Sequence, residues 1–266
     1  RDTGDRRHVG VYLGNLGSIY RFQGRMDLAI EIFMEALDIA RDLGDKRHLG
    51  VWLGNLGNLY LDQRQLDQAT GAYTQALEVA REVGDRRGEA IRLASLGHVL
   101  EVQGREEEAL EFQSQALEVA REVGDKRLEG ITLGNMADVL SKLGRVEEAQ
   151  EAYRRAITIC DAHEPGAAGA FRGEYALSLA QSGRTEEAQP LLQLGEPQVE
   201  RYPNQYLKFV CRKGWVFHLA GDAVGARAAL EQAQRIAVEH QISSDSEVGQ
   251  EALALQAELS GDEQRT

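Results

Sequence analysis

Asparagine amides recur along the chain at a spacing suited to holding an extended peptide. Asn15, Asn55 and Asn135 are separated by 40 residues or a multiple of 40, and Ser95 fills the same position between them. An asparagine side chain offers two donors and an acceptor, so it can pair with both the N–H and the C=O of an extended backbone. Copies spaced one repeat apart would hold a peptide at successive points without reading its side chains. We therefore predict a binding groove that contains these four residues.

Two further registers belong to the same predicted groove. One lies about a helical turn beyond the asparagines and consists of Ser18, Asn58, His98 and Asp138. The other lies at the start of each unit and consists of Arg47, Arg87 and Arg127. Arginines at these places suit charge-assisted contacts with acidic side chains of a ligand. Ion pairs with acids of the following helix, such as Glu82 or Glu122, are the alternative, and the sequence leaves both open.

Glycines stand directly before the asparagines, at Gly14, Gly54 and Gly134. Inside a helix each costs about 1 kcal/mol relative to alanine, which indicates that something approaches the backbone closely there. A bound peptide is one explanation. The other is packing of the glycines and asparagines against the adjacent helix, with asparagine bridging the two helices. The two explanations are compatible, and both remain open at the level of the sequence.

The elements that must position these residues form an internal repeat. Units of 40 residues begin at Gly4, Gly44, Gly84 and Gly124 with no insertion. Apolar residues keep helical spacing in two segments of each unit, which in the first run from about Arg7 to Gln23 and from Met26 to Leu43. Glycines are expected to end the helices in a left-handed conformation, and aspartates such as Asp45 are expected to cap the next ones. Small residues, such as Gly17 and Ala29, are expected to let the two helices of a unit approach closely.

Beyond His163 the repeat continues in a degenerate form. We predict four regular units over residues 1–163, two degenerate units over 164–242, and a capping helix with a tail over 243–266. Pro190 is expected in the first turn of a helix and Pro203 in an entry loop. About 13 helices are expected in total.

The residues of the first unit resemble the tetratricopeptide signature. They are Leu13, Leu16, Gly17, Tyr20, Gly24, Ala29, Phe33, Ala36 and Leu37. The signature has 34 residues and an initial tryptophan, whereas this unit has 40 residues and a leucine in that place. The longer variant is similar to the repeats of the Pins/LGN adaptors and of bacterial regulatory arrays.

This resemblance implies an all-α fold, a right-handed α-solenoid of stacked antiparallel helix pairs. In such arrays the first helix of each pair lines a concave groove that binds an extended peptide or partner segment. The resemblance therefore implies a protein-interaction adaptor and not an enzyme. The alternative function is a regulatory or sensor domain of a larger multidomain signalling enzyme. The start of the chain matches the middle of a later unit, so we expect it to belong to a longer protein.

Charge and composition narrow the choice of partner. The formal net charge is −13 and the isoelectric point is about 5.0, so phosphate backbones and acidic membrane surfaces would be repelled. We expect a protein or peptide partner, neither nucleic acid nor membrane, and a cytoplasmic location. We also expect that the N-terminal edge of the array can self-associate. A small basic cluster at Lys208, Arg212 and Lys213 is a further place where an acidic ligand could bind, with a solvated helix face as the alternative.

Catalytic, metal and cofactor motifs are not found in the sequence. The glycine-rich GNLGN stretch lies within a helix, follows no strand and lacks the Lys-Ser/Thr ending of a phosphate loop. The histidines show no metal-ligand spacing, and Cys160 and Cys211 fit reduced core thiols. We therefore expect no cofactor and no catalytic residue.

Overall fold

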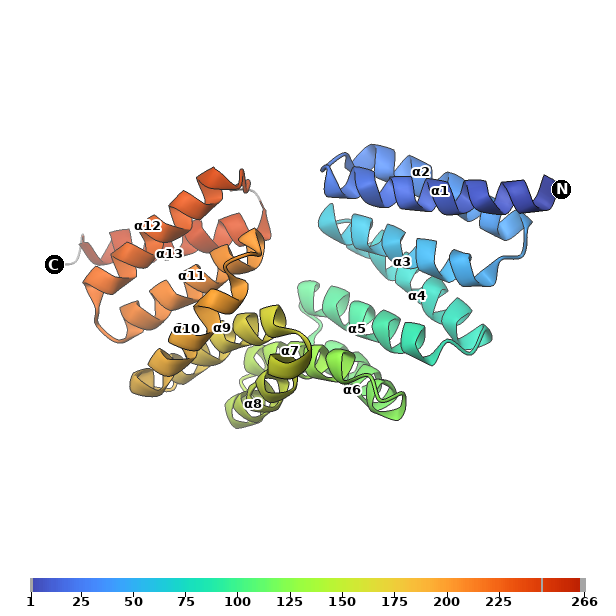
Figure 1. Ribbon diagram of the computed structural model, residues 1–266. Helices are drawn as coiled ribbons and strands as arrows, with labels where there is room; N and C mark the ends of the chain where they lie inside the picture. The colour runs from blue at the N-terminus through green and yellow to red at the C-terminus, as the bar shows by residue number, and fades with distance from the viewer. Residues whose placement is uncertain (1, 245, 264–266) are drawn as a thin grey trace. The chain divides into compact units, whose positions relative to one another are not determined.

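The computed structural model describes residues 2–244 and 246–263 and folds them into 13 α-helices without a strand (Figure 1). This confirms the predicted all-α repeat architecture. The helices are α1 (Asp2–Phe22), α2 (Met26–Asp42), α3 (Lys46–Asp62), α4 (Leu66–Glu82), α5 (Arg86–Val102), α6 (Glu106–Glu122), α7 (Lys126–Lys142), α8 (Val146–His163), α9 (Pro165–Gln181), α10 (Thr185–Val199), α11 (Pro203–Leu219), α12 (Ala223–Glu239) and α13 (Glu247–Glu263).

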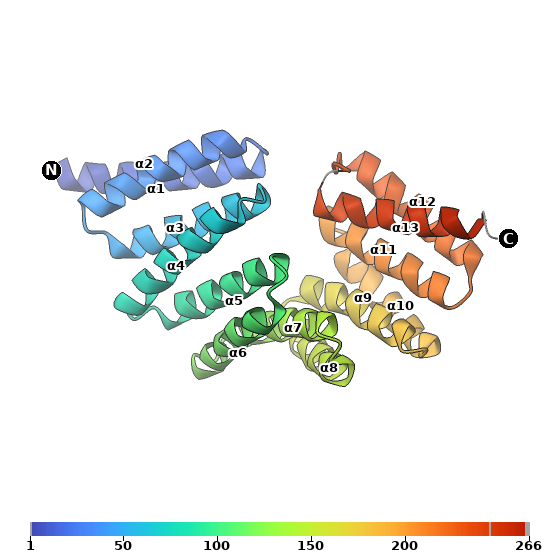
Figure 2. The same cartoon turned by 180° about the vertical axis from the view of Figure 1, so that it is seen from behind.

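The chain divides into two compact units, residues 1–128 and 129–266. In unit 1 the pairs α1/α2, α3/α4 and α5/α6 stack in chain order, so that α2 packs against α3 and α4 against α5 (Figures 1 and 2). In unit 2, α9 packs against α10 and α11 against α12, and α13 packs against both α11 and α12. The predicted division at residues 163 and 242 concerns the regularity of the sequence and stays a prediction. We call the first helix of each pair the A helix and the second the B helix.

Left-handed residues end the helices, as predicted. Gly24 has φ +74° between α1 and α2, and Gly44 has φ +62° between α2 and α3. The turn between α3 and α4 differs, because a non-glycine residue, Arg64, holds φ +60° there. A side chain in this conformation is strained by roughly 1–2 kcal/mol. The first helix also differs from its prediction: it begins at Asp2 instead of Arg7, because Gly4 lies within the helix and forms no turn.

The predicted aspartate caps are confirmed at the starts of α3, α5 and α7. Asp45 accepts a hydrogen bond from the backbone N–H of His48 at 3.2 Å, and Asp85 accepts one from Gly88 at 2.9 Å. Asp125 accepts the equivalent bond from Leu128 at 3.0 Å. Each cap satisfies a backbone donor that the start of a helix leaves without an intrahelical partner. The recurring Gly-Asp pair is therefore structural.

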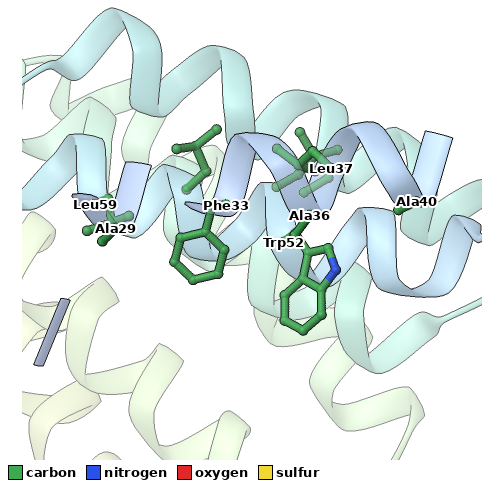
Figure 3. Packing of buried hydrophobic residues seen from close by; sticks show 10 residues of the cluster. Ala29, Phe33, Ala36, Leu37, Ala40, Trp52 and Leu59 are labelled. Carbon is green, nitrogen blue, oxygen red and sulfur yellow. The ribbon is translucent and has the colours of Figure 1, made fainter. Parts of the chain in front are cut away.

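The core of the first repeat shows how the small residues let the helices approach. Ala29, Phe33 and Leu37 of α2 are fully buried, and Trp52 of α3 reaches into the same cluster (Figure 3). The ring centroids of Phe33 and Trp52 are 6.2 Å apart. A Cβ atom on Gly17 would lie 3.0 Å from the Phe33 ring, so this glycine sets the spacing between α1 and α2. This confirms the expected close contact within a pair.

The two proline predictions for unit 2 are wrong. Pro190 is the sixth residue of α10 and not part of its first turn, because the left-handed residue Gly183 closes α9 and fixes the start of α10 at Thr185. Pro190 is exposed, so its ring faces solvent on a helix that continues past it. Pro203 is the first residue of α11 and not part of a loop, where its fixed φ suits the helix and no intrahelical donor is lost.

Neither membrane spans nor metal clusters appear in the part of the chain that the structure describes. No helix there has the length and apolar content needed to cross a bilayer. No group of three or more histidine, cysteine or acidic side chains is arranged to hold a metal ion there.

Candidate functional site

The predicted asparagine register lies on the A helices with its amides available. Asn15 is exposed, and Asn55 and Asn135 are half-buried. None of the three makes a side-chain hydrogen bond to another residue that the structure describes, so their amides do not bridge neighbouring helices. Ser95, the divergent member, differs because its hydroxyl donates to the backbone oxygen of Ile91 at 2.9 Å.

The second predicted register is engaged within the repeats. Asn58 accepts a hydrogen bond from the hydroxyl of Tyr73 at 2.6 Å, and Asp138 accepts one from Tyr153 at 2.5 Å. Both bonds join an A helix to its own B helix, and burial raises the pKa of Tyr73 to about 12. Asn58 and Asp138 thus have a structural role in addition to any contact with a ligand.

The other two members of this register make local contacts. The Ser18 hydroxyl donates to the backbone oxygen of Gly14 at 3.1 Å. His98 lies 3.4 Å from the Glu101 carboxylate, and its ring is exposed. The polar atoms that this register can present to a partner therefore differ from repeat to repeat.

The glycines before the asparagines are explained by packing between successive A helices. A Cβ atom on Gly14 would lie under 3 Å from the ring of Trp52, and one on Gly54 would clash equally with the guanidinium of Arg92. A Cβ atom on Gly134 would likewise lie under 3 Å from the ring of Phe171. A large side chain from the next A helix therefore lies over each glycine. Packing within the chain thus accounts for these glycines, and the asparagine amides remain available beside them.

Two of the repeated arginines form ion pairs with residues other than Glu82 and Glu122. Arg7 and Arg87 bind the capping aspartates of the next A helix, with Arg87 Nε 2.7 Å from Asp125 Oδ2 and Arg7 Nε 3.1 Å from Asp45 Oδ2. The Asp125 carboxyl has a lowered pKa because of its cap bond and the charges of Arg87 and Arg127.

The predicted acids of the B helices have other partners. Glu82 pairs with Lys46 and Glu122 with Arg86, each one residue before the arginine that we expected. The expected partner was wrong because the first side chain of the A helix reaches the end of the B helix in its own pair, whereas the next arginine, at Arg7 and Arg87, pairs with the cap of the next A helix. Arg47 is the exception, since it makes no ion pair with any residue that the structure describes.

Arg47 lines a pocket of about 360 Å³ between α3, α4 and α5. Three cations and one acid contribute to its wall, and the rest is small or aliphatic. The full lining is Lys46, Arg47, Gly50, Val51, Ala76, Val79, Ala80, Val83, Asp85, Gly88 and Arg92. We call this cavity the α3–α5 pocket.

Arg92 is a part of this pocket that the repeat pattern alone does not predict. Its guanidinium lies over Gly54, is half-buried and forms no salt bridge with the described residues. Burial lowers its pKa, while the charges of Tyr73 and Asp85 act in the opposite direction. The signal was present in the sequence as an arginine at the repeat position that Trp52 occupies one unit earlier. It becomes informative only once the glycine beneath it is known.

The positive charges of the basic cluster in unit 2 are neutralised by acidic side chains of the same unit. Lys208 and Arg212 both bind Glu174, with nitrogen–oxygen distances of 3.0 and 2.9 Å, and Arg212 also binds Glu251. Lys213 binds Glu196 at 2.7 Å. The two cations hold the pKa of Glu174 at about 2 despite its burial. The solvated face that we considered for this cluster is wrong for Arg212, which is largely buried, and the cluster's cations already have acidic partners in the chain.

The sequence matches a known family over two stretches. Residues 9–82 and 89–162 match the sequence profile of the tetratricopeptide repeat. None of the curated proteins matches the chain.

Solved structures share the fold at low sequence identity. BtubC from P. vanneervenii is 19% identical with a TM-score of 0.67, over 82% of this chain and 93% of that one. A Rap protein complexed with Competence and Sporulation Factor is 15% identical with a TM-score of 0.69, over 95% of this chain and 76% of that one. Aspartyl phosphate phosphatase F from Bacillus subtilis is 17% identical with a TM-score of 0.72, and this chain covers 60% of its length. At these identities the likeness concerns the fold alone.

Proposed function

We propose, from the premise that this chain belongs to the tetratricopeptide repeat family, that its A helices hold an extended segment of a partner protein. Repeats of this kind generally form interaction scaffolds without catalytic activity, because stacked helix pairs present extended binding surfaces. The available amides of Asn15, Asn55 and Asn135 carry the proposal. Each can donate to and accept from a peptide backbone without breaking a contact within the chain.

The proposal is tested by removing the three amides together. The variant N15A/N55A/N135A is compared with Q68A/Q75A/Q115A, which removes three exposed amides from the B helices. Partners are captured from a lysate of the source cells and quantified by mass spectrometry. The proposal predicts partners that the control variant retains and the asparagine variant loses. If both variants capture the same partners in equal amounts, the asparagine register does not bind.

The location of this binding follows the sequence division that we predicted. The regular units of residues 1–163 would hold the peptide in a concave groove, with Ser18, Ser95 and His98 as variable contacts. The degenerate units of residues 164–242 and the cap of 243–266 would add shape. Similarity to the Pins/LGN adaptors, on the 40-residue unit and the GNLGN core, supports a cytoplasmic adaptor that binds protein and not nucleic acid.

The second candidate function is a regulatory domain of a larger signalling enzyme. The α3–α5 pocket favours it, since a cavity of about 360 Å³ suits a small ligand. The sequence of the full-length gene distinguishes the two candidates, because a catalytic domain on the same chain supports regulation and its absence supports an adaptor.

Self-association through α1 is a separate proposal about partners. Tyr12 and Phe22 are 70% and 95% exposed, and Tyr12 occupies the repeat position at which Trp52 is buried. Analytical ultracentrifugation over a wide concentration range tests it with the variant Y12S/F22S. A wild-type protein that stays monomeric at every concentration contradicts the proposal.

A further inference from the structure

Two arginines in the α3–α5 pocket lack a carboxylate partner among the described residues. Arg47 and Arg92 come from different A helices, yet both line the same cavity. Elsewhere in unit 1 the corresponding arginines are paired: Arg7 binds Asp45 and Arg87 binds Asp125. Arg92 is half-buried and Arg47 is exposed beside it. Because a partly buried guanidinium needs hydrogen-bond acceptors, the two side chains mark a place where an acceptor from outside the chain would be stabilised.

The charges around the pocket set the charge of the ligand. Lys46 is already bound by Glu82, and Asp85 offsets one of the two remaining cations. One net positive charge is therefore left for a ligand, which matches a single carboxylate better than a phosphate dianion. The whole chain carries a charge of −13, so attraction must come from these short-range contacts and not from long-range steering.

The rest of the wall sets the shape of the ligand. Val51, Val79 and Val83 supply aliphatic surface, and Gly50 and Gly88 leave room beside it. We propose that the α3–α5 pocket binds a monocarboxylate carried on an apolar stem, with Arg47 and Arg92 holding the carboxylate and the valines covering the stem. Two sources share this chemistry: a free small organic acid and the C-terminal residue of an apolar peptide.

This inference rests on the proposed function and adds a carboxylate site to it. Either the carboxylate site or the asparagine contacts can be disproved without the other. The asparagine amides are not part of the pocket wall, and Arg92 is not part of the predicted groove. N15A/N55A/N135A should therefore leave carboxylate binding intact, whereas R92Q should leave the backbone contacts of the asparagines intact.

Isothermal titration calorimetry on the full chain tests the proposal. The probes are sodium hexanoate, hexanamide, inorganic phosphate, and the peptide Ala-Ala-Ala-Leu as its free acid and as its C-terminal amide. We expect one saturable site for hexanoate or for the peptide acid. Tighter binding of hexanoate identifies a free acid as the source, and tighter binding of the peptide acid identifies a chain end.

Variants then place the bound carboxylate. R92Q and R47Q should each weaken binding at least tenfold, because each removes a charge-assisted pair of hydrogen bonds. The control R154Q removes the same charge from an exposed ion pair in unit 2 and should have no effect. Circular dichroism confirms that each variant is folded.

Three outcomes overturn the proposal. One is equal binding of hexanamide and hexanoate, since the carboxylate would then be irrelevant. Another is phosphate displacing hexanoate at equal concentration, since the stem would then contribute nothing. The third is the absence of saturable binding for every probe up to about 10 mM, ten times a dissociation constant of 1 mM (about −4.1 kcal/mol), while R154Q and the wild type are equally folded.

Discussion

The α3–α5 pocket and its counterpart one repeat earlier are built from the same positions and differ in volume more than tenfold. The earlier cavity, between α1, α2 and α3, measures about 10 Å³, against about 360 Å³ for the later one. Its nine lining residues all correspond to lining residues of the α3–α5 pocket at an offset of 40. Six of the nine pairs are identical, and the other three are Ile39 with Val79, Leu43 with Val83, and His48 with Gly88.

These three pairs place larger side chains around the earlier cavity than around the later one. Isoleucine and leucine carry one methylene more than valine, and the His48 ring occupies space that Gly88 leaves open. The His48 ring also lies 3.0 Å from Asp45 and stacks on Trp52 at 5.7 Å, so it is held in place. A filled contact in one repeat can therefore correspond to an open pocket in the next, although six of nine lining positions are identical.

The largest expected effect is a difference in stability loss between two residues that each lie over a glycine, Trp52 and Arg92. Trp52 is buried against Phe33, so W52A should destabilise the protein by about 3–5 kcal/mol, as large-to-small changes in a core do. Arg92 stands at the same repeat position but lines a cavity, so R92A should cost about 1 kcal/mol or less. Chemical denaturation measures both. Equal losses would show that Arg92 is a core residue and not a ligand-binding one.

A second effect contrasts the unpaired cations of the α3–α5 pocket with the paired cations of unit 2. Glu174 sits between Lys208 and Arg212, so E174Q leaves buried positive charge without its main partner and should cost about 3 kcal/mol. E187Q, in an exposed ion pair, is the control and should leave the melting temperature unchanged.

The same carboxylate predicts a pH dependence. The pKa of Glu174 is about 2 in the folded chain and 4.5 without its surroundings, so the folded state favours the ionised form. Its stabilisation is fully present above pH 4.5 and is lost as the pH falls toward 2. Wild-type stability should therefore fall more steeply than that of E174Q over this range. Parallel curves in urea titrations would contradict the assignment.

A smaller effect is expected from a substitution that fills the pocket with the residue of the earlier repeat. G88H places the residue of the first cavity into the second. A Cβ atom on Gly88 would lie 2.3 Å from Asp85 Oδ2, so the Asp85 carboxylate must turn aside before it can bind the new ring as Asp45 binds His48. We expect hexanoate binding to weaken at least tenfold, about 1.4 kcal/mol, with little change in unfolding. Calorimetry measures the binding. The matched variant G71H, on the exposed surface of α4, should leave it unaltered.

The smallest effect concerns the turns of the same two repeats. Gly24 turns α1 into α2, whereas Arg64 holds the same conformation between α3 and α4. R64G relieves that strain, partly offset by the greater freedom of glycine in the unfolded chain, and should stabilise the protein by about 0.5–1 kcal/mol. A lower melting temperature for R64G would mean that the contacts of the arginine outweigh its strain.

Local features of the fold could be predicted from the sequence, because they depend on residues close in the chain. The turns at Gly24 and Gly44 and the cap at Asp45 need only a left-handed residue and a short acceptor. The position of Pro190 could not be predicted in this way. Pro190 was expected in the first turn of a helix, but the turn at Gly183 places the start of α10 at Thr185.

Contacts between repeats were harder to predict, because periodicity does not show which residue of one unit covers which residue of the next. The role of Gly54 became clear only when Arg92 was found above it. The partner of Glu82 was misjudged by a single residue for the same reason, since Lys46 and not Arg47 reaches it. The available amides of Asn15, Asn55 and Asn135 agree with the predicted groove, but a partner is needed to test it.

The glycine beneath each large side chain has a consequence for how such an array can diversify. Trp52, Arg92 and Phe171 differ in size, charge and shape, yet each lies over a glycine of the preceding A helix. The same small residue therefore accommodates either an aromatic ring or a guanidinium from the next A helix. Substitution at this one position can therefore replace an aromatic contact between repeats by a guanidinium, while the glycine beneath it stays the same.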